Sequence, residues 1–189
     1  MTDREIGKRV RVLLEAGDAR AAASAAIEGL GPSVFGLLCA LHGRDDAQDV
    51  FSAFAEDLWR GLPGFRWECS LRAWAFRIAH NASHRFRRDP WRVRRERLRS
   101  SAASRLARSV SSASLRQGGD ERIDVLGAEL EPDDRALLVL RVRRGMAWEE
   151  IAVALSSDGQ RVSAATLRKR FERLKARMAE MARDKGLLP

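Results

Sequence analysis

SLRAWAFRIAHN, residues 70–81, is the stretch that decides the fold. Apolar residues recur in it every three or four positions, which is the period of an amphipathic α-helix. The same period continues and predicts a helix over residues 70–88. One side of this helix should face a core. That side consists of Leu71, Trp74, Ala75, Ile78 and Ala82.

The other side of this predicted helix combines an aromatic ring with cations. We expect Phe76 to be exposed there, which is unusual on a solvated face. Unpaired bases stack on aromatic rings while cations hold the phosphates, so this side predicts binding of single-stranded nucleic acid. Trp67, in the preceding loop, would add a second ring. The alternative is that Phe76 packs against an N-terminal helix. The predicted contacts are Trp67, Arg72, Phe76, Arg77, His80 and Asn81.

Catalytic and metal-binding patterns are scarce. His80 and His84 are four residues apart and could share a metal ion, but the sequence suggests no third ligand nearby, so we expect no zinc site. A glycine-rich phosphate loop, a nucleophile elbow and an acid–base constellation are also missing from the sequence. An enzyme is therefore disfavoured, and no cofactor is expected.

Helical periodicity covers most of the chain, and no stretch alternates with the period of a strand. Helices are expected over residues 4–16, 18–30, 32–43, 45–61, 70–88, 133–144, 148–156 and 163–183, with breaks at 29–32 and 61–64. The helical period of apolar residues is lost between Asp89 and about Gly127. A transient helix over 91–108 is the secondary structure that this segment could still form. The prediction is an all-α fold of two small helical domains, residues 1–90 and 129–189, joined by a flexible linker at 91–128.

Charge is distributed unevenly over the 189 residues. The net charge of +9 comes from two positive blocks: residues 86–116 carry ten arginines and two acids, and residues 135–189 carry 13 basic and six acidic side chains. The segment between them is acidic, and residues 1–85 are neutral. Two positive blocks favour a polyanionic partner, most simply nucleic acid, although a basic surface that only aids solubility is the alternative.

Targeting signals are not apparent. The chain has no run of 18 uninterrupted apolar residues, and its first residues lack the apolar region of a signal peptide. Cys39 and Cys69 sit within apolar helical patterns, which predicts that they are small core residues. Unpaired cysteines of this kind are typical of proteins in a reducing compartment. We therefore expect a cytoplasmic protein without membrane insertion.

The C-terminal helices predict a helix-turn-helix. Pro132 suits a first helical position, Gly145 a C-terminal cap and Ser163 an N-terminal cap. On the last helix Leu167, Phe171, Leu174 and Met178 form one apolar stripe, and a basic face lies opposite. The predicted contacts of this face with duplex DNA are Ala165, Thr166, Arg168, Lys169 and Arg173.

An acidic face is expected on the helix from residue 45. Its apolar side holds Phe51 and Phe54, and the opposite side carries Asp45, Asp49 and Glu56. Acidic side chains would repel DNA, so a basic protein partner is more plausible than nucleic acid. A solvated face is the alternative.

Together these segments resemble bacterial RNA polymerase sigma factors, especially the small extracytoplasmic-function (ECF) class. Residues 46–59 resemble region 2.2, and residues 70–81 look like region 2.3, where the family reads SFRTWLYRIARN. Residues 13–18 look like the usual opening of an ECF sigma factor, and residues 131–152 resemble region 4. The segments occur in the family's order.

This resemblance implies partners and roles. The acidic face would dock on the β′ clamp helices of core RNA polymerase, and the loop 61–70 with the helix after it would open the −10 promoter element. The last helix would read the −35 element, and the linker would thread through the polymerase. An anti-sigma factor is a plausible further partner. A free-standing helix-turn-helix regulator that acts without polymerase is the alternative.

The chain departs from the family at three places. Ser52-Ala53 replaces a usual Gln-Glu pair, and Ala147 replaces the usual hydroxyl cap. The turn before the last helix, through Ser156–Gln160, is about five residues longer than the family norm. That turn affects how the last helix would meet DNA.

Overall fold

The computed structural model describes residues 1–88, 126–127, 129–157 and 161–186. Nearly all of the predicted linker, its optional helix over 91–108 and most of the first positive block lie outside these residues, as do residues 158–160 of the long turn. The described parts are mostly helical, as expected for an all-α fold. The helices are α1 (Asp3–Glu15), α2 (Ala19–Gly61), α3 (Leu71–Arg88), α6 (Pro132–Leu138), α7 (Trp148–Leu155) and α8 (Ala164–Asp184), with short helical turns η1 (Leu62–Gly64) and η3 (Val139–Arg143).

Local capping interactions explain where several helices begin and end. Thr2 and Glu5 form a capping box at α1, with each side chain accepting a hydrogen bond from the other's backbone N–H. Pro132 is the first residue of α6, as predicted. The Ser163 side chain accepts from the Thr166 N–H at 3.1 Å, which confirms the predicted cap of α8. Gly145 has φ 58°, the left-handed conformation expected of a C-terminal cap.

The predicted break at residues 29–32 is wrong, because α2 continues through Pro32. Proline removes one backbone donor from a helix, but buried side chains on both sides of it, including Ile27 and Phe35, keep α2 packed. The boundary between the helices expected over 32–43 and 45–61 is correct in place: Gly43 has φ 74° and kinks the helix. One bent element therefore stands where three helices were expected.

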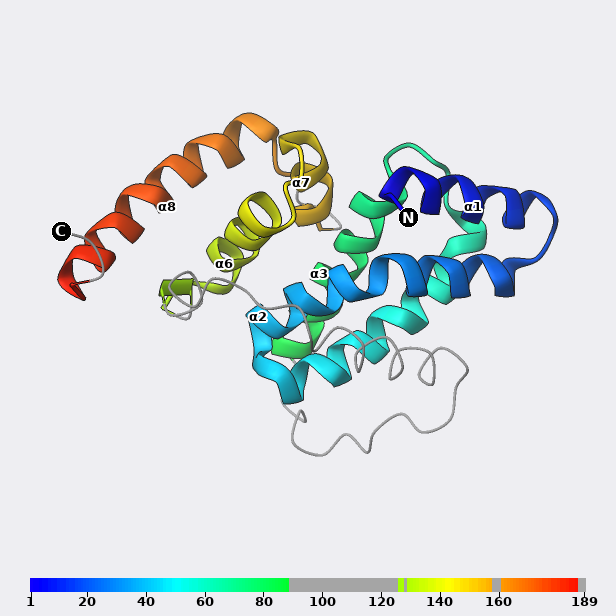
Figure 1. Ribbon diagram of the computed structural model, residues 1–189, viewed down its shortest axis with the longest axis horizontal. Coiled ribbons are helices and arrows are strands. Elements are labelled where there is room, and N and C mark those ends of the chain that lie inside the picture. The colour runs from blue at the N-terminus through cyan, green and yellow to red at the C-terminus, as the bar shows by residue number, and fades with distance from the viewer. Residues whose placement is uncertain (89–125, 128, 158–160, 187–189) are drawn as a thin grey trace.

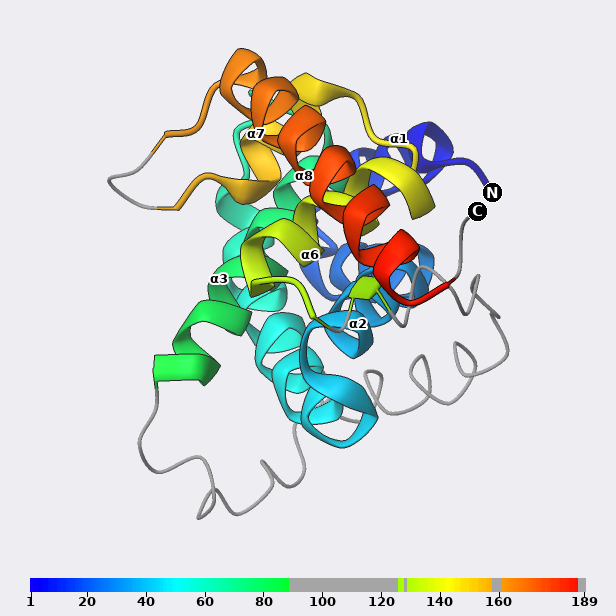
Figure 2. The same cartoon turned by 90° about the vertical axis from the view of Figure 1, so that its left-hand side faces the viewer.

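Helix α3 lies at the centre of the molecule, with α1 and α2 on one side of it and α6, α7 and α8 on the other (Figure 1). A second view shows α8 passing over α6 and continuing beyond it (Figure 2). Buried side chains of all these helices form one continuous apolar core. The N-terminal and C-terminal helices that were expected to form separate domains thus share a core in this arrangement.

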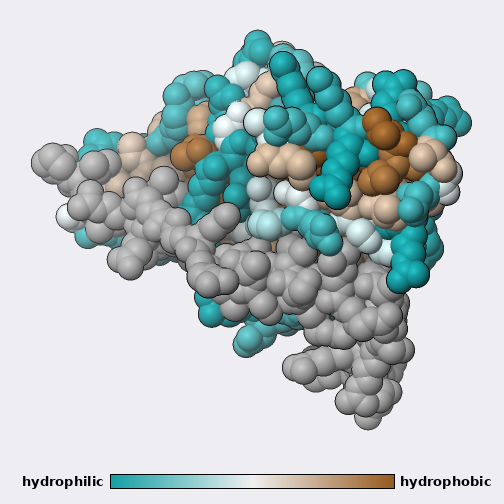
Figure 3. Space-filling model, turned by 45° about the vertical axis from the view of Figure 1, so that its right-hand side comes forward, coloured by the Kyte–Doolittle hydropathy of each residue, from teal (hydrophilic) through white to brown (hydrophobic). Residues whose placement is uncertain are grey.

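Helix α2 is apolar and long enough to cross a membrane by length and composition alone. However, 56% of its most apolar window is buried inside the protein, as in the central helix of a globular domain. On the face in Figure 3 most described side chains are hydrophilic, and apolar ones form only small patches.

Candidate nucleic-acid interface

Three aromatic rings meet at the start of α3. The Phe65 ring stacks on Trp74 with centroids 4.6 Å apart, and it also contacts Trp67 at 4.8 Å. Trp67 has φ 59°, a conformation that side chains with a Cβ adopt only at a cost. The Arg11 guanidinium from α1 lies 5.6 Å from the Trp67 ring. The loop therefore holds Trp67 in a strained position between an aromatic ring and a cation.

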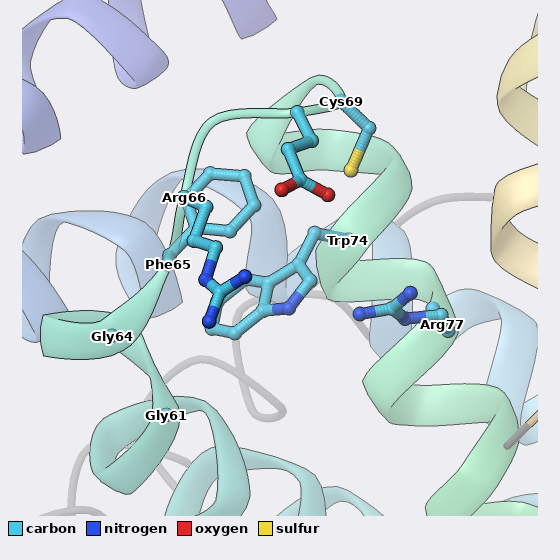
Figure 4. A pocket seen from close by; sticks show the side chains of 8 residues that line it. Gly61, Gly64, Phe65, Arg66, Cys69, Trp74 and Arg77 are labelled. Atoms are coloured by element: carbon cyan, nitrogen blue, oxygen red, sulfur yellow. The ribbon is translucent and has the colours of Figure 1, made fainter.

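A pocket of about 260 Å³ opens beside these rings. Figure 4 shows the Phe65 and Trp74 rings within it, with the guanidinium groups of Arg66 and Arg77 nearby. Burial raises the pKa of the Cys69 thiol, which is a neutral group at the pocket wall. The residues lining the pocket are Gly61, Gly64, Phe65, Arg66, Glu68, Cys69, Trp74 and Arg77. Aromatic faces with adjacent guanidinium groups are the combination that holds an unstacked base and its phosphate.

The expectation that Phe76 is exposed is wrong. Its side chain is 1% exposed, and on the same side of α3 His80 is 4% and Ser83 0% exposed. The physical reason is that α3 packs against α1 and α2 and also against α7, so more than one side of the helix is covered. The ring of Phe76 belongs to the core, which was the alternative interpretation.

Another line of side chains on α3 remains accessible. Arg77 and Asn81 are partly exposed, and Arg85 and Arg88 are exposed. Arg72 points elsewhere: it pairs with Asp3 at 2.9 Å and donates to the carbonyl of Arg144. Of the predicted single-strand contacts, Trp67, Arg77 and Asn81 are thus accessible beside the pocket. The i, i+4 spacing of Arg77, Asn81 and Arg85 is the sequence signal that indicates this line.

Helix α8 presents its predicted basic face to solvent. All five predicted contacts, from Ala165 to Arg173, are exposed, while Leu167, Phe171 and Leu174 are buried. The Trp148 ring of α7 contacts Phe171 edge-on at 5.5 Å and fixes α8 against α7. Arg168 also pairs with Glu149 at 3.1 Å, but both side chains are exposed, so this pair is weak and can be exchanged for a phosphate.

The acidic face of α2 follows the kink at Gly43. Asp45 and Asp49 are exposed, as predicted. Glu56 is only partly exposed and pairs with Arg60 at 3.3 Å. The two aspartates are therefore the more accessible part of this face.

Direct contacts join the first helices to the last. The Arg144 side chain lies over Gly36, where an added Cβ would collide with its Nη2. Ser70 donates to Glu150 at 2.8 Å, and Arg135 donates to the Ala40 carbonyl at 3.2 Å. Arg144 is partly buried, and this burial lowers the pKa of its guanidinium. These contacts hold the C-terminal helices against α2 and the start of α3.

The fold and these surfaces define a helical protein with two accessible cationic faces suited to nucleic acid. Residues 26–93, which include all of α3 and most of α2, match the family model of Sigma-70 region 2. This match supports a non-enzymatic role in transcription initiation, with core RNA polymerase and promoter DNA as partners, and it does not favour a free-standing regulator. No curated protein matches the chain.

Proposed function

We propose that the protein is an ECF-type sigma factor, a promoter-specificity subunit of RNA polymerase. The observation that carries this proposal is the pocket at the start of α3, because it lies inside the segment that matches Sigma-70 region 2. In this proposal residues 1–90 bind core polymerase and open the −10 element, residues 129–189 read the −35 element, and residues 91–128 connect them. An anti-sigma factor is a further expected partner.

In this proposal the pocket holds a base of the opened strand. The Trp67 ring and the Phe65–Trp74 stack supply aromatic faces, and such stacking contributes about 1–3 kcal/mol per base. Arg66 and Arg77 supply positive charge for the adjacent phosphates. Because base pairing must be lost before a base can enter, the pocket favours opened over duplex DNA. Asn81 and Arg85 would extend the contact along α3.

Asp45 and Asp49 are proposed to contact the clamp helices of the polymerase β′ subunit. Both are exposed and lie one helical turn apart on α2. Glu28, which is also exposed on α2 but far along it, offers a matched control. The double change of Asp45 and Asp49 to lysine should abolish co-migration with core polymerase in size-exclusion chromatography, whereas Glu28→Lys should not.

Reconstitution tests the proposal as a whole. The purified chain is mixed with core RNA polymerase, and transcription is measured on genomic fragments. Specific transcripts are expected only with the chain present. Trp67→Ala and Arg77→Ala should reduce strand opening, measured by permanganate reactivity of unpaired thymines, while co-migration with core polymerase is retained. A chain that does not co-migrate with core polymerase would overturn the proposal.

A further inference from the structure

A three-residue cluster joins α3 to α6. His80 and His84 come from successive turns of α3, and Asp133 comes from the first turn of α6. The two histidine Nε2 atoms are 3.1 Å apart. Asp133 Oδ1 lies 3.5 Å from Nε2 of His84 and 3.9 Å from Nε2 of His80. The sequence suggests no third ligand for this histidine pair, and the fold supplies one from a distant part of the chain.

These separations fit a tetrahedral metal site. Zinc binds imidazole nitrogen at about 2.0–2.1 Å and carboxylate oxygen at about 2.0–2.2 Å, so neighbouring ligand atoms of a tetrahedron lie roughly 3.3–3.5 Å apart. The three distances in the cluster, 3.1, 3.5 and 3.9 Å, bracket that spacing. Shifts of a few tenths of an ångström, within the freedom of these side chains, would bring all three atoms to one ion.

The cluster is also partly shielded from solvent. His80 is 4% exposed, and the side chains of His84 and Asp133 are 29% and 45% exposed. Among the described residues, Nδ1 of the buried His80 has no hydrogen-bond partner.

Arg87 is the competing cation at this site. Its Nη2 lies 3.5 Å from Asp133 Oδ1 and 3.0 Å from His84 Nδ1. The side chain is at the end of α3 and is 23% exposed, so it can turn toward solvent. In the absence of a metal ion it neutralises part of the Asp133 charge. A metal ion would have to replace it there.

We propose that His80, His84 and Asp133 bind one divalent transition-metal ion, for which Zn²⁺ is the best fit, with the fourth position left to water. Two imidazoles and one carboxylate favour zinc, cobalt or nickel over magnesium and calcium. Because the ligands come from α3 and α6, the bound ion ties the C-terminal helices to the face of α3 that they cover. This inference rests on the contacts of the cluster and is independent of the proposed role in transcription.

Calorimetric titration of the metal-free, full-length chain with zinc chloride tests the site. We expect one Zn²⁺ per chain, a higher unfolding temperature with zinc, and no comparable effect of magnesium chloride. Asp133→Asn and His84→Gln should each weaken zinc binding by at least about 100-fold, because loss of a partner that only orients a ligand already costs about 10–100-fold. Both positions are partly exposed, so the fold should survive, which circular dichroism checks.

Matched variants distinguish the loss of a metal ligand from the loss of a negative charge or of a histidine elsewhere in the chain. Asp134→Asn changes the same charge one residue away, but Asp134 pairs with Arg170 and Arg177 of α8. His42→Gln removes the third histidine of the chain, which bonds to Ser83 instead. Both should keep zinc affinity, and Arg87→Ala should increase it. Equal zinc affinity in wild type and Asp133→Asn, or an equal loss in Asp134→Asn, would overturn the proposal.

Discussion

Gly29 and Gly7 are both helical glycines, but they have different surroundings. A Cβ added to Gly29 would lie 2.8–3.0 Å from three side-chain atoms of Ile6, whereas nothing lies within 4 Å of one added to Gly7. Ile6 is buried and has little room to move. Gly29→Ala should therefore destabilise the protein by about 1–3 kcal/mol through overpacking, while Gly7→Ala should stabilise it by about 0.5–1 kcal/mol.

Urea unfolding curves of the two glycine variants measure this difference. Gly7→Ala is the control because it makes the same chemical change inside a helix, at a position where no atom lies near the added Cβ. If both substitutions stabilised the chain to the same extent, the close approach of α1 to α2 at Ile6 would be incorrect.

Phe76→Ala should act through stability. Because the ring is 1% exposed, its truncation leaves a cavity in the core and should cost about 3–5 kcal/mol. Polymerase binding and strand opening should then fall together, in proportion to the folded fraction seen by thermal unfolding. A variant of wild-type stability that fails only in strand opening would instead mean that the ring contacts DNA.

At the scale of single helices, most of the fold follows from local patterns. The bounds of α1, α3, α7 and α8 agree with the apolar period and the caps to within a residue or two. What local patterns miss is how many sides of a helix are covered. The small side chains Ala73, Ala75, Ala79 and Ala82 allow neighbours to approach α3 from several directions, and they are the signal that it is central.

Helix α8 should bind duplex DNA through charges at its N-terminal end. Arg168→Ala and Lys169→Ala should each weaken binding at all sequences and reduce the slope of log affinity against log salt by about 1 if they contact phosphates. Fluorescence anisotropy across a salt series measures the slope. Arg183→Ala, the same change at the far end of α8, is the control and should leave the slope unchanged.

At the scale of the whole molecule, the surroundings of α3 depend on contacts between residues far apart in the sequence, which local sequence patterns do not predict. The Asp133 carboxylate meets the α3 histidines, and the Arg144 side chain lies over Gly36, because the chain returns to α3 after a long separation. Sequence periodicity locates each helix, but it cannot say which helices pack together. For this reason the solvent exposure of the α8 face agrees with the prediction, whereas the predicted exposure of Phe76 and His80 is wrong.

The shared core predicts cooperative unfolding. Native-state hydrogen exchange should give α3, α6 and α7 similar opening free energies, because each of these helices contributes to one continuous cluster. A single substitution, Arg144→Ala, tests this further. It should lower the protection of backbone amides against exchange more in α3 and α7 than in α1. Exchange of α6 and α7 at much lower free energy than α3 would indicate two units that dock only weakly.

The covered side of α3 imposes a conformational cost on anything that must reach it. A ligand of that side binds only the fraction of chains in which α7 has moved away, and its apparent dissociation constant is the intrinsic one divided by that fraction. An opening free energy of about 2.7 kcal/mol leaves roughly 1% of chains competent and weakens apparent binding about a hundredfold. The pocket beside Trp67 is open without this movement, so its ligand would bind with the intrinsic dissociation constant. At equal intrinsic affinity, a ligand of the pocket would therefore bind more tightly than a ligand of the covered side.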